Sequence, residues 1–165
     1  MGTLALIGLG SNLGDRRATL LRAIAELDGS PGVSVGKVSA FHETEPVGGP
    51  PGQGPYLNAA ASLETTLEPR ELLRLLHRIE ARNGRTRDVH WGERTLDLDL
   101  LLYDDRIMET SELSIPHPRM AGRRFVLEPL AEIAPGAVDP VTGKTVAMML
   151  EDLNRESRDG QKRCW

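Results

Sequence analysis

The chain has 165 residues, of which 39% are hydrophobic and 27% charged, and its formal net charge is −4. These values are typical of one globular domain, and the acidic balance argues against a dedicated nucleic-acid-binding domain, which is usually basic. No apolar run approaches the roughly 20 residues that cross a membrane, and the N-terminus lacks the basic start of a signal peptide. The single cysteine, Cys164, cannot form an internal disulfide. We therefore expect one cytoplasmic domain over residues 1–165.

In the first half of the chain, hydrophobic spacing predicts alternating strands and helices. Residues 3–9 form a short apolar run typical of a buried strand. Leucines and an isoleucine then recur at helical spacing up to Asp28-Gly29, where the helix should end. Strands are expected at residues 33–44 and 56–66.

The second half continues the same pattern. A helix should begin at Pro69, a residue suited to a first helical turn, and end before Gly84. Residues 95–103 are the clearest strand, and a short hairpin is expected after Asp104-Asp105. Further helices are predicted at residues 124–133 and 145–153, and the tail from about residue 154 is expected to be flexible.

The predicted order is β-α-β-β-α-β with appended elements. This order predicts an α+β fold with a ferredoxin-like core, in which helices flank a mainly antiparallel sheet and a hairpin and helices follow at the C-terminus. Two long connections interrupt it. Eight of the ten residues at positions 46–55 are glycine or proline, and residues 84–93 lack strand or helix periodicity. Loops of this size in a compact domain are often lids, so we expect a site that closes over its ligand.

The segment at residues 96–100, Leu-Asp-Leu-Asp-Leu, is the strongest candidate for chemistry. Alternate residues of a strand share a face, so Asp97 and Asp99 should point together while the leucines face the core. Two adjacent carboxylates repel each other, and a divalent cation with nucleotide phosphates relieves that repulsion. A solvent-exposed acidic strand face would give the same pattern, so the choice between a metal site and an exposed face depends on the neighbouring residues.

The chain contains seventeen arginines and three lysines. Four of the arginines, at positions 70, 74, 78 and 82, follow helical spacing and should coat a solvent face. Arg85, Arg87 and Arg94 lie beyond that helix and lead into the acidic strand. Planar guanidinium groups opposite a metal-binding carboxylate pair suit a polyphosphate. In the same loop, Trp91 is interpreted as a lid residue, with a core position as the alternative.

Two familiar nucleotide motifs fail. Gly143-Lys144-Thr145 resembles the end of a P-loop, but Val138 occupies the position of the required glycine. The glycines at positions 8, 10 and 14 resemble a dinucleotide fingerprint whose last glycine is one position late. Outside these motifs, His117 near several arginines could contact phosphate or be an ordinary loop residue. Tyr56 and Asn58 could line a pocket for a flat heterocycle, although Tyr56, like Phe125, could equally belong to the core.

Five segments together resemble the 6-hydroxymethyl-7,8-dihydropterin pyrophosphokinase family of folate biosynthesis. They are GLGSNLGD at residues 8–15, FHETEPVG at 41–48, YLNAA at 56–60, RIEARNGRTRDVHWGERTLDLDLLLY at 78–103, and IPHPRM with GRRFVLEPLAEIAP at 115–120 and 122–135. The chain departs from the family pattern at four positions, namely His90, Glu93, Pro118 and Gly122.

The resemblance implies transfer of the β,γ-diphosphate of ATP to the hydroxymethyl group of the pterin, with release of AMP. It implies two Mg²⁺ ions on Asp97 and Asp99, and catalytic roles for these aspartates with Arg85 and Arg94. The implied pterin-binding residues are Thr44, Glu45, Val47, Tyr56, Asn58 and Phe125. The implied ATP-binding residues are Glu80, Arg87, Trp91, Leu100, His117 and Arg123.

The sequence is also compatible with other functions. A ferredoxin-like RNA- or nucleotide-binding module has the same element order, but it would need exposed aromatic residues on its central strands. A pterin-binding relative without activity, and a kinase that moves only the γ-phosphate, are further alternatives. We expect a monofunctional monomer with small-molecule substrates and neither nucleic-acid nor membrane partners.

Overall fold

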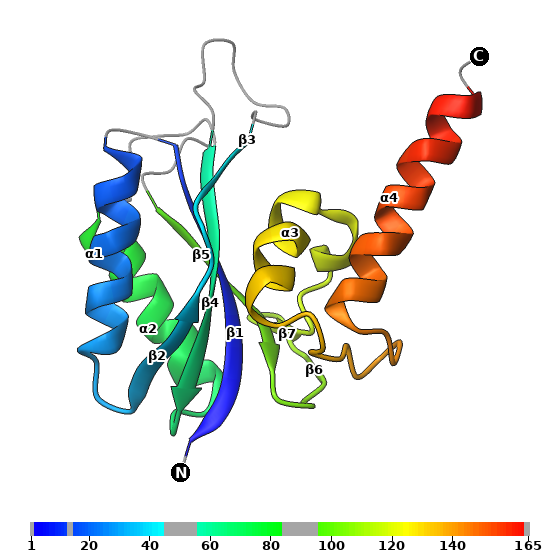
Figure 1. Ribbon diagram of the computed structural model, residues 1–165. Coiled ribbons are helices and arrows are strands. Elements are labelled where there is room, and N and C mark those ends of the chain that lie inside the picture. The colour runs from blue at the N-terminus through cyan, green and yellow to red at the C-terminus, as the bar shows by residue number, and fades with distance from the viewer. Residues whose placement is uncertain (1, 13–14, 45–55, 84–95, 164–165) are drawn as a thin grey trace.

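The structure is a computed structural model. It describes the backbone of residues 2–12, 15–44, 56–83 and 96–163, and the side chains of these residues up to position 156. Figure 1 shows a central sheet between two helical layers. None of the helices in the described part of the chain is both long and apolar enough to cross a membrane.

The sheet is antiparallel throughout the described residues. Its order is β2-β4-β1-β5, and the short β3 pairs with the same strand as β2. The strands are β1 (Thr3–Ser11), β2 (Val33–Val38), β3 (His42–Thr44), β4 (Tyr56–Thr65) and β5 (Asp97–Tyr103). The two strands at the centre, β1 and β4, pair along their whole length without a register shift, and they therefore form the rigid middle of the sheet.

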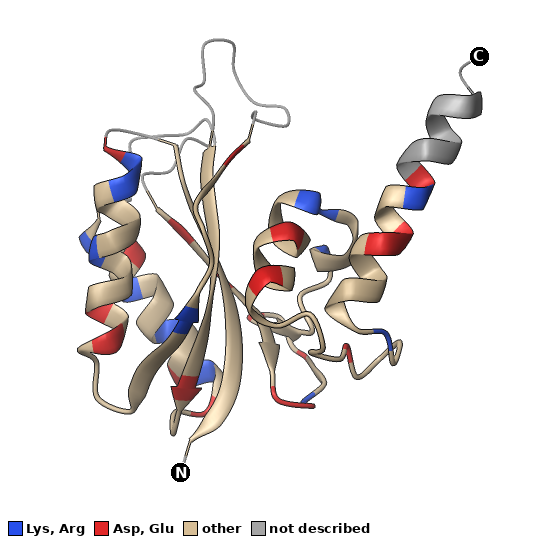
Figure 2. Cartoon of the chain, in the orientation of Figure 1, with Lys and Arg blue, Asp and Glu red and all other residues tan. Residues whose placement is uncertain are grey.

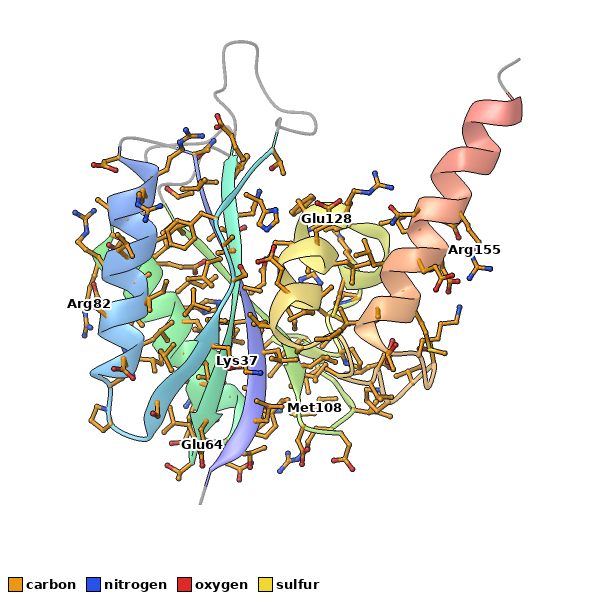
Figure 3. The ribbon with its side chains drawn as sticks, viewed as in Figure 1. Lys37, Glu64, Arg82, Met108, Glu128 and Arg155 are labelled. Atoms are coloured by element: carbon orange, nitrogen blue, oxygen red, sulfur yellow. The ribbon has the colours of Figure 1, made fainter. Side chains whose placement is uncertain are left out.

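Helices α1 (Arg16–Asp28) and α2 (Pro69–Arg82) cover one face of the sheet (Figure 1). Each has a satisfied N-terminus: the Asp15 side chain accepts a hydrogen bond from the Ala18 amide at 3.1 Å, and Glu68 and Glu71 form a capping box at the start of α2. Leucines, isoleucines and alanines from both helices and from alternate strand positions form the larger core here. Figure 3 shows Arg82 on the outer side of this layer, as expected for the solvent face of α2.

The other face carries a smaller core, formed with the 3₁₀ turn η1 (Met120–Gly122), α3 (Arg124–Ile133) and α4 (Val146–Arg163). The hairpin of β6 (Met108–Glu109) and β7 (Ser114–Ile115) follows β5, and its Leu113 and Ile115 belong to the larger core. Leu127 and Leu130 of α3 and Met149 of α4 pack in the smaller core with Leu6, Leu101 and Leu102 of the sheet. One end of this face of the sheet, beside the start of α3, has no helix over it (Figure 1).

Most predicted elements are confirmed, and three boundaries are corrected. The predicted strand at residues 33–44 is two strands, because Ser39 interrupts it. The Ser39 hydroxyl accepts the Ala60 amide at 2.9 Å, which replaces a backbone bond of the ladder. The strand predicted at residues 95–103 begins at Asp97, and residue 95 lies outside the described part of the chain. The final helix begins at Val146 and continues past the predicted end at residue 153 to Arg163.

Candidate active site

A cavity of about 510 Å³ opens at the uncovered end of the sheet, between the strands and the start of α3. Its lining residues come from β1, β3, β4, β5, η1 and α3 and from Arg123, which precedes α3. They are Gly8, Leu9, Gly10, Thr44, Tyr56, Asn58, Ala59, Asp97, Asp99, Gly122, Arg123, Arg124, Phe125 and Val126. Seven of the residues predicted for the site therefore meet in one cavity.

Two glycines of β1 form the floor of this cavity. Gly8 pairs with Asp99, and Gly10 pairs with Asp97 on one side and with Asn58 on the other. Paired residues of neighbouring strands point to the same face, so glycine between these side chains leaves a hollow. A Cβ atom on Gly10 would lie 3.1 Å from the Asn58 Oδ1 atom.

The acidic wall is the start of β5, and the predicted alternation there is confirmed. Asp97 and Asp99 line the cavity, whereas Leu96, Leu98 and Leu100 are buried in the larger core. Farther along the strand, the register with β1 shifts next to Leu101. This bulge places Leu101 and Leu102 together in the smaller core, so β5 contributes to both cores as well as to the site.

A buried carboxylate supports the acidic strand from below. Glu80 of α2 is 2% exposed, and its Oε2 atom accepts a hydrogen bond at 2.9 Å from the backbone amide of Leu98, the residue between the two aspartates. Glu80 therefore fixes the backbone on which both carboxylates stand. The side chain of Leu100, another residue that the resemblance assigns to ATP binding, faces the core.

The opposite wall is basic. Arg123 and Arg124 line the cavity at the start of α3, and Figure 2 shows this basic segment across from the acidic positions of β5. The His117 Nε2 atom lies 4.0 Å from Asp99 Oδ1, and its Nδ1 atom accepts the Arg119 amide at 3.2 Å. That acceptor role assigns the proton to Nε2, on the side of the acidic pair.

The imidazole of His117 is mostly neutral at neutral pH. Burial is the main reason that its pKa lies below 6.5, and the charges of Arg123 and Arg119 lower it further against an opposing effect of Asp97. A neutral ring with its proton on Nε2 is a hydrogen-bond donor that adds no charge of its own.

Aromatic and amide groups form the remaining wall. Tyr56 on β4 and Phe125 on α3 both line the cavity, and the Arg123 guanidinium lies 5.5 Å from the Phe125 ring centre. The buried Asn58 donates from Nδ2 to the Thr44 hydroxyl at 2.6 Å, which orients its amide oxygen. This wall can receive a flat ring and read its edge through polar atoms.

Six other predicted site residues lie outside the described residues. They are Glu45, Val47, Arg85, Arg87, Trp91 and Arg94. Conversely, sequence reasoning did not select Gly8, Gly10, Gly122, Arg124 or Val126, all of which line the cavity. For Gly8 and Gly10 the sequence does contain a signal, because glycines two residues apart in an otherwise apolar strand leave a gap on one face.

Carboxylates that face arginines beside an aromatic, amide-lined recess are typical of enzymes that transfer phosphate groups to a ring-bearing substrate. Comparisons with known proteins also point to this class of enzyme. Residues 6–135 match the protein-family model described as 7,8-dihydro-6-hydroxymethylpterin-pyrophosphokinase. The chain belongs to this family.

Curated relatives carry the corresponding name, 2-amino-4-hydroxy-6-hydroxymethyldihydropteridine pyrophosphokinase. The protein of Bacillus subtilis (strain 168) is 51% identical over 133 residues, which cover 81% of this chain and 79% of the relative. The protein of Synechocystis sp. (strain ATCC 27184 / PCC 6803 / Kazusa) is 46% identical over 150 residues, which cover 91% of this chain and 76% of the relative.

Among solved structures, the fold is similar to that of Plasmodium falciparum HPPK-DHPS wild type with pterin and p-hydroxybenzoate. The TM-score is 0.75 at 13% identity, and the match covers 97% of this chain and 44% of that one. A second HPPK-DHPS structure, in complex with substrates, gives a TM-score of 0.73 at 12% identity over 96% of this chain and 45% of that one. The chain therefore spans less than half the length of these proteins, and at this identity they show the fold alone.

Proposed function

We propose that this chain transfers the β,γ-diphosphate of ATP to the hydroxymethyl group of 6-hydroxymethyl-7,8-dihydropterin, producing the pterin diphosphate and AMP in folate biosynthesis. The observation that carries the proposal is the meeting of Asp97 and Asp99 with Arg123 and Phe125 in one cavity of a chain that belongs to the pyrophosphokinase family. The acidic groups there would bind metal ions, the basic groups would bind the phosphates of ATP, and the aromatic groups would bind the pterin ring.

The acidic pair fits Mg²⁺ bound together with ATP. Among the described residues there is no group of three or more His, Cys, Asp and Glu side chains that could hold a metal ion by itself. Mg²⁺ commonly uses one or two carboxylates and completes its shell with water and substrate phosphates. Asp97 and Asp99 would hold two ions, which would neutralise phosphate charge when bound.

The ring of the pterin would lie between Tyr56 and Phe125, and Thr44 and Asn58 would bind its edge with the backbone near Glu45 and Val47. Stacking between two aromatic rings and hydrogen bonds from an oriented amide together select a flat, polar heterocycle. The fixed amide of Asn58 supports this assignment because its orientation is set before any ligand arrives.

The triphosphate would lie between the acidic and basic walls. Arg123 and His117 would contact phosphate oxygens with Arg85 and Arg94, while Arg87, Trp91, Leu100 and Glu80 would border the nucleotide. For Leu100 and Glu80 the buried side chains favour an indirect role, through the backbone of β5.

Catalysis would then be mainly positioning and charge neutralisation. The chain's residues would hold the pterin hydroxyl in line with the β-phosphorus, and the arginines would stabilise charge that develops on the transferred group. We assign no strong general base.

Two broader assignments belong with this proposal. Taking β1, β2, β4 and β5 in chain order, the strand order and antiparallel pairing support a ferredoxin-like core. We further infer a monomer, which we place in the cytoplasm, where ATP is available.

A nucleotide assay tests the proposed reaction. The protein is incubated with ATP, Mg²⁺ and 6-hydroxymethyl-7,8-dihydropterin, and the nucleotides are separated. We expect AMP to accumulate in step with pterin consumption. Accumulation of ADP would identify a γ-phosphate kinase instead, and the absence of turnover would favour a relative that only binds pterin.

The glycine floor gives a second test. Gly10→Ala should raise the dissociation constant of the pterin about tenfold, because the new methyl group enters the hollow beside Asn58. The fold should persist, since the close neighbour is a side-chain oxygen. Calorimetric titration measures the effect, and Gly136→Ala, which meets nothing within 4 Å, is the matched control. Pterin affinity unchanged by Gly10→Ala would place the ring elsewhere.

A further inference from the structure

One carboxylate joins two walls of the cavity without lining it. Glu132 lies in the last turn of α3, and its Oε1 atom accepts the backbone amide of Ala40 at 2.9 Å. Its Oε2 atom bonds the Nε2 atom of His42, the first residue of β3. One side chain of α3 therefore bonds both to the β2–β3 connection and to β3.

Each end of this link is coupled to a residue of the cavity. Glu132 and Phe125 are seven residues apart in α3, which is about two helical turns, so they lie on the same face of the helix. In the neighbouring ladder, His42 pairs with Asn58 and Thr44 pairs with Tyr56. Displacement of α3 relative to β3 would thus change the separation of Phe125 from Tyr56.

The strand β3 needs such support because it is only three residues long and pairs with β4 alone among the described strands. On its other side, α1 supplies contacts: Arg16 lies 3.5 Å from Glu43, and the Arg17 guanidinium lies 5.2 Å from the Phe41 ring centre. Glu132 supplies the corresponding contact from α3. The short strand is thereby held between the two helical layers.

The side chain of Glu132 is ionised at neutral pH. The Ala40 amide is the main cause that lowers its pKa, and the hydrogen bond and charge of His42 add to the effect against the opposing effect of burial. An ionised carboxylate can accept both hydrogen bonds at once.

We propose that Glu132 is a positioning residue for the pterin: it sets the distance between Phe125 and the Tyr56–Thr44 wall, and so the width of the slot for the ring. This inference rests on the proposed function, because it names a residue that acts on the pterin subsite of the same cavity. Glu132 does not line the cavity. Its effect should therefore fall on the affinity for pterin and leave the nucleotide subsite near β5 unaffected.

The test compares Glu132→Ala, Glu132→Gln and the wild type. Calorimetry measures pterin binding with Mg²⁺ and a non-hydrolysable ATP analogue present, and steady-state kinetics give KM for each substrate. For Glu132→Ala we expect a rise of about tenfold in the pterin dissociation constant and KM, the effect of losing one or two hydrogen bonds, with KM for ATP unchanged. Glu132→Gln keeps an acceptor for the Ala40 amide, so it should restore part of the affinity.

The matched control is Asp152→Ala, which removes a partly exposed carboxylate on α4 that bonds Lys144 at 2.7 Å and does not line the cavity. It should leave both KM values at the wild-type level, and thermal unfolding should show all variants folded. Wild-type pterin affinity in Glu132→Ala, or an equal loss of affinity for pterin and ATP, would overturn the positioning role. Failure of the wild type itself to bind pterin would overturn the proposed function, and this inference with it.

Discussion

Asp97→Asn and Asp99→Asn should each lower turnover by about 10²- to 10⁴-fold, because each removes a charged oxygen ligand from the proposed metal site. Both carboxylates line the cavity from one face of β5, and the described residues contain no group of three or more His, Cys, Asp or Glu side chains that could hold a metal ion without them. Asparagine retains the shape of the side chain and loses its charge. The measurement is kcat with saturating ATP, Mg²⁺ and pterin.

The loss should be one of chemistry and not of folding. Neither aspartate is buried in a core, so the free energy of unfolding should change by no more than about 1 kcal/mol in either variant. Asp105→Asn, an exposed change in the turn after the same strand, is the control and should have wild-type turnover. Near-normal kcat in Asp97→Asn or Asp99→Asn would remove the metal assignment.

Glu80→Ala should lower the free energy of unfolding by about 3 kcal/mol and reduce turnover as well. The change leaves the Leu98 amide without the carboxylate that it bonds and opens a cavity beneath β5, and each of these effects destabilises a protein. Because Leu98 lies between Asp97 and Asp99, a shift of its backbone also displaces the proposed metal ligands. Chemical denaturation and kcat together measure the two effects.

Glu80→Gln distinguishes support of the strand from a requirement for charge. Glutamine retains an acceptor oxygen of the same reach, so this variant should recover most of the stability lost in the alanine variant. Recovery of turnover alongside stability would show that Glu80 acts by holding the strand. Wild-type stability in Glu80→Ala would contradict the role of the buried hydrogen bond.

The helices and the central strands were predictable because their periodicity is strong. α2 begins at Pro69 as predicted, and α3 occupies the predicted residues 124–133. The two aspartates also followed from sequence alone, since alternation on a strand puts them on one face whatever their neighbours are. Periodicity and alternation are sufficient to predict features that depend on a single helix or strand.

Features that depend on two elements could not be predicted. The glycine floor requires the register of β1 with both β4 and β5, which no single segment contains. The division between β2 and β3 arises from a bond between Ser39 and Ala60, and Glu132 is 92 residues from Ala40 along the chain. Each of these contacts joins segments that are far apart in the sequence, so the pattern of residues within one segment does not reveal it.

The resemblance to a family supplied what spacing could not. It named the pterin and the diphosphate, and it selected Thr44, Asn58, Tyr56 and Phe125, which the structure brings to one cavity. The alternative of an RNA-binding module loses support, because the chain belongs to the pyrophosphokinase family and because the β5 wall of the cavity presents two carboxylates, which would repel a phosphate backbone.

The fate of the β-phosphate of ATP tests the central claim most directly. The protein is incubated with Mg²⁺, 6-hydroxymethyl-7,8-dihydropterin and ATP labelled in its β-phosphate, and the pterin product is isolated. Diphosphate transfer predicts that the label moves to the pterin and that the nucleotide product is unlabelled AMP. Label that stays with the nucleotide as ADP would contradict the account.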